Sequence, residues 1–311
     1  MQEKRSLLSN GAAIVGRNKR YVVWFYLLNL AVATIGATAF VQHARPLMDK
    51  SLYANGLVQG FDLGVLAELL ARPEFGPMRA SSAPAMTLAI LFFLLTMIFL
   101  PGVFLGYASD HRVSREEFFR TCGRNIWRFV RLMIMFAIVG GIVAGILFGV
   151  QGALVKAADA SSQETLPFWV QTASLVVIFI VMTLIRIWFD LAEADTVLTD
   201  QGAVRKSVGT AFRQTKENLG GLLASYVAIS IVGLVIMGAG LWLWNVLVPP
   251  ASVWGAFLIS QLILLLLLAI RFWQRATAVS LYLRSVSEEP AEIQPSPTVV
   301  PVTAAMPAAG I

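Results

Sequence analysis

Long apolar stretches alternate with short basic segments along this chain, and the alternation predicts its architecture. A helix crosses the ~30 Å hydrocarbon core of a bilayer with about 20 apolar residues. Six stretches meet this requirement, near residues 21–42, 85–107, 132–150, 168–188, 222–247 and 252–273. We therefore predict an all-α, polytopic membrane protein with six transmembrane helices.

The spans would make up one membrane domain, residues 1–284. Residues 43–84 form the largest connection between spans. They are expected to lie on the outer side of the membrane, opposite to the cytoplasm, as a partner-binding or pore-capping loop or as a short helix on the outer leaflet. Residues 285–311 are rich in proline, small and acidic residues. Such a composition cannot build a core, so this tail is expected to be disordered in the cytoplasm.

The segment before the third span is a basic amphipathic helix. Ser114 followed by Glu117 is the pattern of a helix-capping box. Four arginines then recur at helical spacing: Arg120, Arg124, Arg128 and Arg131. A basic helix that also carries aromatic residues lies well on an anionic membrane face. Similar segments elsewhere add further residues expected to bind lipid headgroups: Arg17, Lys19, Arg20, Arg213 and Lys216.

Two short patterns recur and suggest an internal repeat. An asparagine in a polar segment precedes the first, third and fifth spans, at Asn18, Asn125 and Asn218. Ile-Arg-Ile-Trp ends the fourth span at 185–188, and Ile-Arg-Phe-Trp ends the sixth at 270–273. Three copies of a unit with a lead-in helix and two spans would explain both patterns. Chance similarity between apolar segments is the alternative.

The distribution of basic residues predicts the orientation in the membrane. Most of the 24 lysines and arginines flank the spans on one side, the side that also holds both chain ends. By the positive-inside rule, both termini are cytoplasmic and the protein lies in a bacterial inner membrane. The net charge of +6 is therefore interpreted as an orientation signal and not as a nucleic-acid-binding surface.

Motifs for catalysis or metal binding are missing from the sequence. The single cysteine excludes a disulfide framework, and no nucleotide-binding, metalloprotease or serine-hydrolase motif occurs. We expect no enzymatic activity, no cofactor and no metal. Charged residues are also missing from the middle of every span, which disfavours proton- or ion-coupled transport.

Two sets of residues are candidates for a site or an interface. Arg186 and Asp190 lie one helical turn apart, and Arg271 and Arg275 could face them from the end of the last span. This predicts a salt-bridge cluster that gates or binds a charged headgroup; solvated helix ends with a snorkelling arginine are the alternative. Three glycines, Gly141, Gly145 and Gly149, form a small-residue ridge on which another helix of this chain or of a second copy could pack.

A resemblance to known proteins rests on three short segments. They are Ser-Asn-Gly-Ala at 9–12, Gly-Arg-Asn at 16–18 and the charged segment 190–195 that follows the fourth span. The chain resembles a diffuse group of uncharacterised bacterial six-helix membrane proteins. That group includes the membrane region fused to some glycerophosphodiester phosphodiesterases. The catalytic domain of those enzymes is absent from this chain, so the resemblance implies the membrane fold and no activity.

Two functions are compatible with these observations. The first is a non-enzymatic membrane organiser or accessory subunit. It would use basic interfacial helices on anionic lipid and would bind a partner protein through residues 43–84, or form a homo-oligomer. The second is a channel- or transporter-like protein for a lipid or a small neutral solute. A continuous polar cavity would favour the second function, and a packed bundle with an apolar outer face would favour the first.

Overall fold

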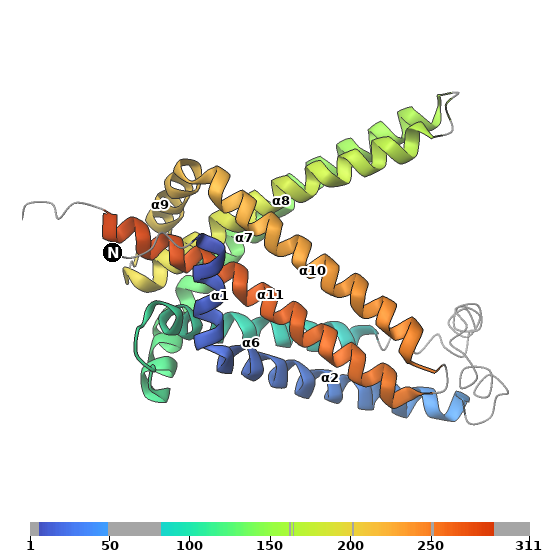
Figure 1. Cartoon of the computed structure of the whole chain (residues 1–311), viewed down its shortest axis with the longest axis horizontal. Helices are drawn as coiled ribbons and strands as arrows, with labels where there is room; N and C mark the ends of the chain where they lie inside the picture. Colours follow the sequence, from blue (N-terminus) through green and yellow to red (C-terminus); the bar gives the residue numbers. More distant parts are fainter. Residues whose placement is uncertain are drawn as a thin grey trace, which may run out of the picture.

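A computed structural model describes residues 6–48, 82–161, 163, 165–200, 202–249 and 252–288, in which all regular structure is helical. The helices are α1 (Leu7–Arg17), α2 (Lys19–Met48), α6 (Ser82–Ala108), α7 (Arg115–Asp159), α8 (Leu166–Leu198), α9 (Val204–Glu217), α10 (Leu219–Leu247) and α11 (Val253–Glu288). Figure 1 shows their arrangement.

Five of the helices, α6, α7, α8, α10 and α11, are long and apolar enough to cross a membrane. They contain five of the six predicted spans, so the all-α, multi-pass architecture is confirmed. The first predicted span, 21–42, falls in α2, where several side chains lie outside the described residues, and it stays a prediction. Most of the predicted outer segment and tail, at 49–81 and 289–311, also lies outside the described residues.

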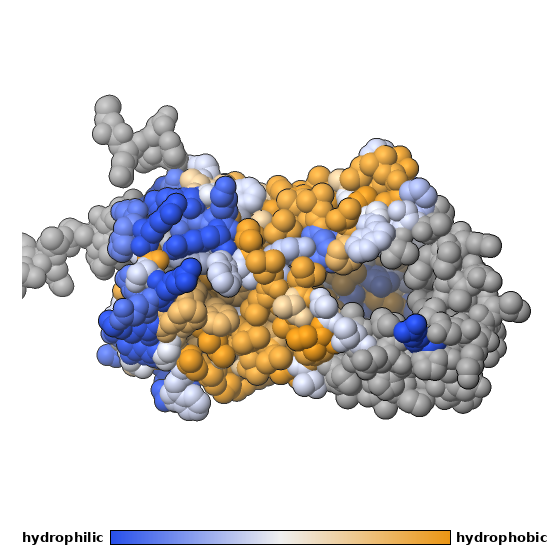
Figure 2. All heavy atoms as spheres, turned by 90° about the horizontal axis from the view of Figure 1, so that it is seen from below, coloured by the Kyte–Doolittle hydropathy of each residue, from blue (hydrophilic) through white to orange (hydrophobic). Residues whose placement is uncertain are grey.

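The helices meet at one end of the molecule; away from it the α7–α8 pair separates from the other helices, while α10 and α11 stay side by side (Figure 1). We call the meeting point the polar end; it holds α1, α9, the first turns of α7 and the last turns of α8 and α11. Figure 2 shows hydrophilic residues gathered there, with a hydrophobic surface beyond it. The 33 residues of α8 make a helix about 50 Å long, so its last turns extend past a ~30 Å hydrocarbon core.

Three helices that return to the polar end, α6, α8 and α11, form the centre of the fold. Each of them packs against the other two. Large side chains from all three are almost completely buried, including Tyr107 on α6, Leu191 on α8 and Phe272 on α11. The predicted spans near 168–188 and 252–273 thus continue as longer helices, because their last turns carry the residues that fill this core.

An amphipathic helix covers each of the three central helices. α1 packs on α11, the start of α7 on α6, and α9 on α8. The indole of Trp273 donates a hydrogen bond of 2.9 Å to the carbonyl of Leu8, and the indole of Trp188 donates one of 2.9 Å to the carbonyl of Val208. Leu8 precedes Asn18 by the same number of residues as Val208 precedes Asn218. The two tryptophan contacts therefore fall at equivalent positions relative to the asparagine that ends each amphipathic helix.

The three asparagines at the start of the spans also behave alike. Asn18 and Asn218 end α1 and α9 with similar backbone angles, φ −112° and ψ 29° against φ −113° and ψ 22°. All three side-chain amides donate to the carbonyl four residues earlier: to Ile14 at 3.2 Å, to Thr121 at 3.0 Å and to Gln214 at 3.3 Å. In α7 the helix continues through Asn125, and Ser114 caps its start as predicted.

Away from the polar end the helices are sparsely covered. In the most apolar 18-residue stretch of α7 only 6% is buried by other described residues, whereas in the corresponding stretch of α8 44% is buried. The pair α7–α8 extends as a separate two-helix arm (Figure 1). Lipid tails solvate apolar side chains as well as other side chains do, so no hydrophobic effect drives these parts of the helices together in a membrane.

The glycine ridge of α7 bears on a prediction about helix packing. A Cβ atom added at Gly141, Gly145 or Gly149 meets no described atom within 4 Å. The described residues therefore do not show the packing of this ridge on another helix of the same chain, and its packing on a second copy stays a prediction. The reason is the divergence of the arm, which leaves this face of α7 without a neighbouring helix.

The contact between α1 and α11 is close enough to require glycine at position 11. A Cβ atom there would lie 3.1 Å from the backbone nitrogen of Thr277 and 3.1 Å from Cδ1 of Trp273. We expect Gly11→Ala to separate the two helices and to destabilise the protein by about 1–3 kcal/mol, as overpacking of a core does. The measurement is thermal unfolding of the purified protein in detergent.

The matched control is Gly16→Ala in the same helix, where an added Cβ meets nothing within 4 Å. It should be neutral or should stabilise α1 by about 0.5–1 kcal/mol, because alanine is the better helix former. Equal stability of the two variants would contradict the close contact of α1 with α11.

Candidate functional site

A charged cluster lies where α8, α10 and α11 meet at the polar end. Nε of Arg186 lies 3.6 Å from Oδ2 of Asp190, one turn along α8. The fully buried hydroxyl of Tyr226 on α10 donates a hydrogen bond of 2.9 Å to the same oxygen. Asp190 is itself buried, and a buried carboxylate needs such partners to remain charged.

Arg271 and Arg275 lie near this cluster on α11, but among the described residues neither forms an ion pair with Asp190 or Glu193, so the predicted four-residue salt-bridge cluster stays a prediction. Both interact electrostatically with Glu193, and Arg271 also interacts with Arg186 and Asp190. Oε2 of Glu193 and Nε of Arg275 are buried without a hydrogen-bond partner among the described residues. The structure therefore brings the four predicted residues together and adds Glu193, but it leaves polar atoms of the cluster unsatisfied.

Two further hydrogen bonds hold the same three helices around the cluster. The amide of Gln274 on α11 donates to the hydroxyl of Ser230 on α10 at 3.0 Å. The hydroxyl of Tyr282 on α11 donates to Oδ1 of Asp195 on α8 at 3.2 Å. These bonds fix the relative rotation of α8, α10 and α11, and so determine which side chains face the cluster.

A second set of ion pairs connects α7 to the end of α8. Oδ1 of Asp200 lies 2.9 Å from Arg124 and 2.6 Å from Arg128. The hydrogen bond from Arg128 lowers the pKa of Asp200, and the charge of Arg124 lowers it further. These two arginines were predicted to bind lipid headgroups, but their charge is shared with a carboxylate of the same chain.

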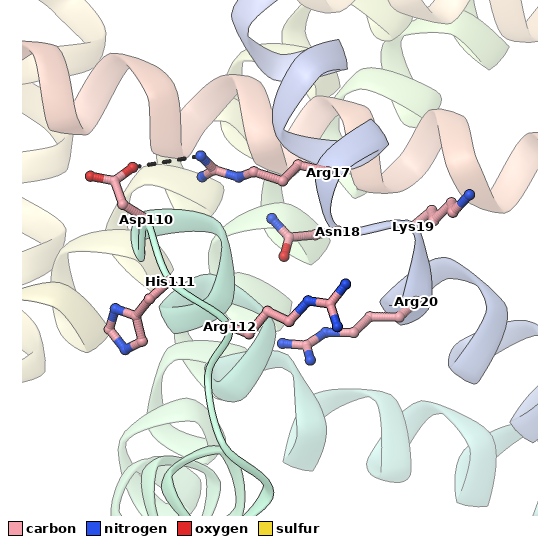
Figure 3. Close-up of a pocket in the computed structure, with 7 residues that line it drawn as sticks. All are labelled: Arg17, Asn18, Lys19, Arg20, Asp110, His111 and Arg112. Atoms are coloured by element: carbon pink, nitrogen blue, oxygen red, sulfur yellow. Dashed lines mark ion pairs between the residues drawn. The ribbon is translucent and has the colours of Figure 1, made fainter.

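The polar end also carries a basic pocket between α1, the start of α2 and the connection from α6 to α7 (Figure 3). The cavity of about 360 Å³ is lined by four cationic side chains, Arg17, Lys19, Arg20 and Arg112, together with Asn18, Asp110 and His111. Arg20 and Arg112 point toward each other in Figure 3.

Arg17 and Arg20 are held in place by contacts with the loop between α6 and α7. Nη1 of Arg17 lies 3.5 Å from Asp110, and Nη2 donates to the carbonyl of Ser109 at 3.2 Å. Arg20 donates to the carbonyl of Val113 in this loop at 3.4 Å, and within α2 it donates to the hydroxyl of Tyr21 at 2.9 Å and lies over that ring at 4.8 Å. The loop thus places Arg112 beside the three basic residues that the sequence predicted to bind headgroups.

The remaining basic residues predicted to bind headgroups lie apart from the pocket, on the surfaces of α7 and α9. Arg120 pairs with Glu116 and Arg213 with Glu217, each within one helical turn. Arg131 lies over the ring of Trp127, with its guanidinium carbon 5.5 Å from the centroid. Lys216 is exposed on the last turn of α9.

The described residues contain no group of three or more His, Cys, Asp or Glu side chains that could hold a metal ion. The buried thiol of Cys122 contacts the carbonyl of Phe99 at 3.7 Å. Comparison of the chain with protein-family models, with curated proteins and with solved structures gives no match.

Several residues of both sites were not selected from the sequence. Tyr226 looks like an interfacial aromatic residue of span five, and only the packing of α10 on α8 brings it to Asp190. Asp200 lies 72 residues from Arg128, a separation at which no spacing rule applies. A useful signal for Arg112 was its position between two spans, next to the basic segment that starts at Ser114.

The bond from Tyr226 to Asp190 predicts a loss of stability on Tyr226→Phe. A hydrogen bond to a charged group contributes about 1.5–3 kcal/mol, and its removal leaves a buried carboxylate with fewer partners. The control is Tyr107→Phe, because the buried hydroxyl of Tyr107 has no partner among the described residues. Thermal unfolding should show destabilisation in the first variant and little or no loss in the second. The reverse order would contradict this geometry.

The lowered pKa of Asp200 predicts a pH dependence. Its carboxylate contributes stability above the unfolded-state pKa, close to 3.8, and loses this contribution as the pH falls through the lower folded-state value. Asp200→Asn should therefore lower the melting temperature at pH 7, and the difference from the wild type should shrink below about pH 4. Asparagine tolerates the φ of 54° at this position, so the substitution changes charge and not backbone.

Glu116→Gln is the control, because it removes an exposed pair within one turn of α7, which contributes little to stability. A Tm difference for Asp200→Asn that stayed constant from pH 7 to pH 3 would show that the carboxylate charge has no such role.

Proposed function

We propose that this chain is a non-enzymatic membrane protein that organises anionic lipids and partner proteins at the cytoplasmic leaflet of a bacterial inner membrane. The observation that carries the proposal is the basic pocket (Figure 3), which is lined by four cationic side chains and one carboxylate and in which Arg20 and Arg112 point toward each other. A lipid phosphate offers the oxygen acceptors and the negative charge that such a group of arginines binds.

The topology belongs to the same proposal. α2 would be the sixth span, since its 30 residues make a helix about 45 Å long. The polar end would face the cytoplasm, because most basic residues of the chain lie there. Three units of lead-in helix and two spans would explain the equivalent asparagine and tryptophan bonds.

The polar groups of the spans support an organiser over a channel or transporter. Hydroxyls of Thr172, Thr183, Ser225, Ser230 and Ser260 donate to the carbonyl four residues earlier in their own helix. Asn245 does the same through its amide. These groups are satisfied within single helices, and a path for a polar solute would need them to face a common cavity.

The experiment is electron paramagnetic resonance of spin-labelled lipids around the purified protein in phosphatidylcholine vesicles. We expect a higher association constant for phosphatidylglycerol than for phosphatidylcholine. A basic residue near an anionic surface contributes about 1 kcal/mol, so Arg20→Gln with Arg112→Gln should reduce this preference severalfold. Arg112→Gln alone provides a second variant that leaves the bonds of Arg20 intact.

Arg205→Gln with Lys206→Gln is the matched control, because it removes the same charge from the exposed face of α9. An equal loss of lipid preference in control and pocket variants would refute a built headgroup pocket. Protein-dependent lipid flipping or solute release from the same vesicles would instead favour the transport function.

A further inference from the structure

Arg186 and Arg271 occupy equivalent places on two central helices. Each lies two residues before a tryptophan whose indole is bonded to an amphipathic helix, Trp188 to α9 and Trp273 to α1. The side chain of Arg186 is 25% exposed, and Arg271 is exposed. The two indole hydrogen bonds thus help to position Arg186 on α8 and Arg271 on α11 at the surface of the charged cluster.

The charges of this cluster do not balance. Arg186, Arg271 and Arg275 carry three positive charges, and Asp190 and Glu193 carry two negative charges at most. Asp190 is occupied by Arg186 and Tyr226, and the described residues place no carboxylate within ion-pair distance of Arg271. One positive charge next to an apolar region therefore lacks a counter-ion among the described residues.

Unsatisfied hydrogen-bonding atoms lie in the same cluster. Nε of Arg275 is buried without a partner among the described residues, although Arg275 interacts electrostatically with Glu193. A buried donor of this kind usually bonds to water or to a ligand. The cluster therefore contains an unpaired donor on Arg275 and an unpaired acceptor on Glu193 that do not bond to each other, and it carries one positive charge in excess, which a phosphate group balances.

Beyond the arginine pair, the surroundings suit hydrocarbon chains. α8 and α10 diverge from the polar end (Figure 1), and both expose apolar side chains along their spans. On α8 these include Val176 and Phe179, and on α10 they include Leu234 and Val235. A ligand with a phosphate at one end and acyl chains at the other matches the arginine pair and the apolar surfaces of α8 and α10 beyond it.

We propose that Arg186 and Arg271 bind the phosphate of one phospholipid, whose acyl chains lie along the diverging α7–α8 arm and α10. Guanidinium groups bind phosphate through paired hydrogen bonds, which a single lysine cannot reproduce. The negative charge of the phosphodiester balances the cluster. This site is separate from the basic pocket, because its residues come from α8 and α11 and none of them lines that pocket.

The test is native mass spectrometry of the full chain purified from membranes in a mild detergent, with lipid identified by fragmentation. We expect one phospholipid to remain bound per wild-type chain after extensive detergent exchange. Loss of one charge-assisted contact corresponds to about tenfold weaker binding or more, so Arg271→Gln should lose most of this lipid. Arg271→Lys should retain less lipid than the wild type and more than Arg271→Gln.

Arg271→Gln is the primary variant because the side chain is exposed and the Arg186–Asp190 pair stays intact. Size-exclusion chromatography and the melting temperature verify its fold. The control Arg205→Gln with Lys206→Gln, and the pocket variant Arg20→Gln with Arg112→Gln, should both keep the lipid. If the pocket variant does not change lipid preference, the proposed function fails but the site at Arg186 and Arg271 is unaffected. If Arg271→Gln keeps its lipid, the site at Arg186 and Arg271 fails but the basic pocket is unaffected.

Three outcomes would overturn the proposal. The first is a wild-type chain that retains no phospholipid, and the second is equal retention by Arg271→Gln. The third is a bound inorganic phosphate in place of a lipid, recognised by its mass and by its exchange with added phosphate. A co-purified protein that Arg271→Gln releases, with no lipid present, would likewise assign the arginine pair to a partner helix.

Discussion

The fold depends on the packing of α6, α8 and α11 at the polar end, where each contacts the other two and carries an amphipathic helix on its outer side. These last turns extend beyond the length that a bilayer core requires. They therefore have access to water, and the hydrophobic effect can drive their association. Within the spans this driving force is missing, and there α8 separates from α6 and α11 as part of the α7–α8 arm (Figure 1).

Hydrogen bonds from Trp188 and Trp273 fix the positions of two amphipathic helices, α9 and α1, along this core. An indole N–H that is buried needs an acceptor, and in both cases the acceptor is a backbone carbonyl in the first turns of an amphipathic helix. One bond connects neighbouring parts of the chain, α8 and α9. The other connects α11 to α1, 265 residues apart in sequence, and so closes the arrangement by bringing the ends of the helical domain together.

The packed polar end and the separate α7–α8 arm bear on the proposed function. Charged groups are concentrated where helices are held firmly: the basic pocket lies beside α1, and the charged cluster lies among α8, α10 and α11. The most apolar stretches of α7 and α11 are only 6% buried by other described residues. Both properties fit a protein whose partners are lipids and other membrane helices, bound laterally, and neither requires a pore.

The sequence alone determined the class of the protein and five of its spans, because the length and hydropathy of a segment decide whether it crosses a bilayer. It also predicted the cap at Ser114 and the proximity of Arg186 and Asp190, which are local relations along one helix. Only the tertiary structure decided what Asp190 and Asp200 bind, since Tyr226 and Arg128 reach them from distant parts of the chain. It also decided that no described residue covers the glycine ridge of α7, because a small-residue pattern permits close packing but does not supply the helix that would pack.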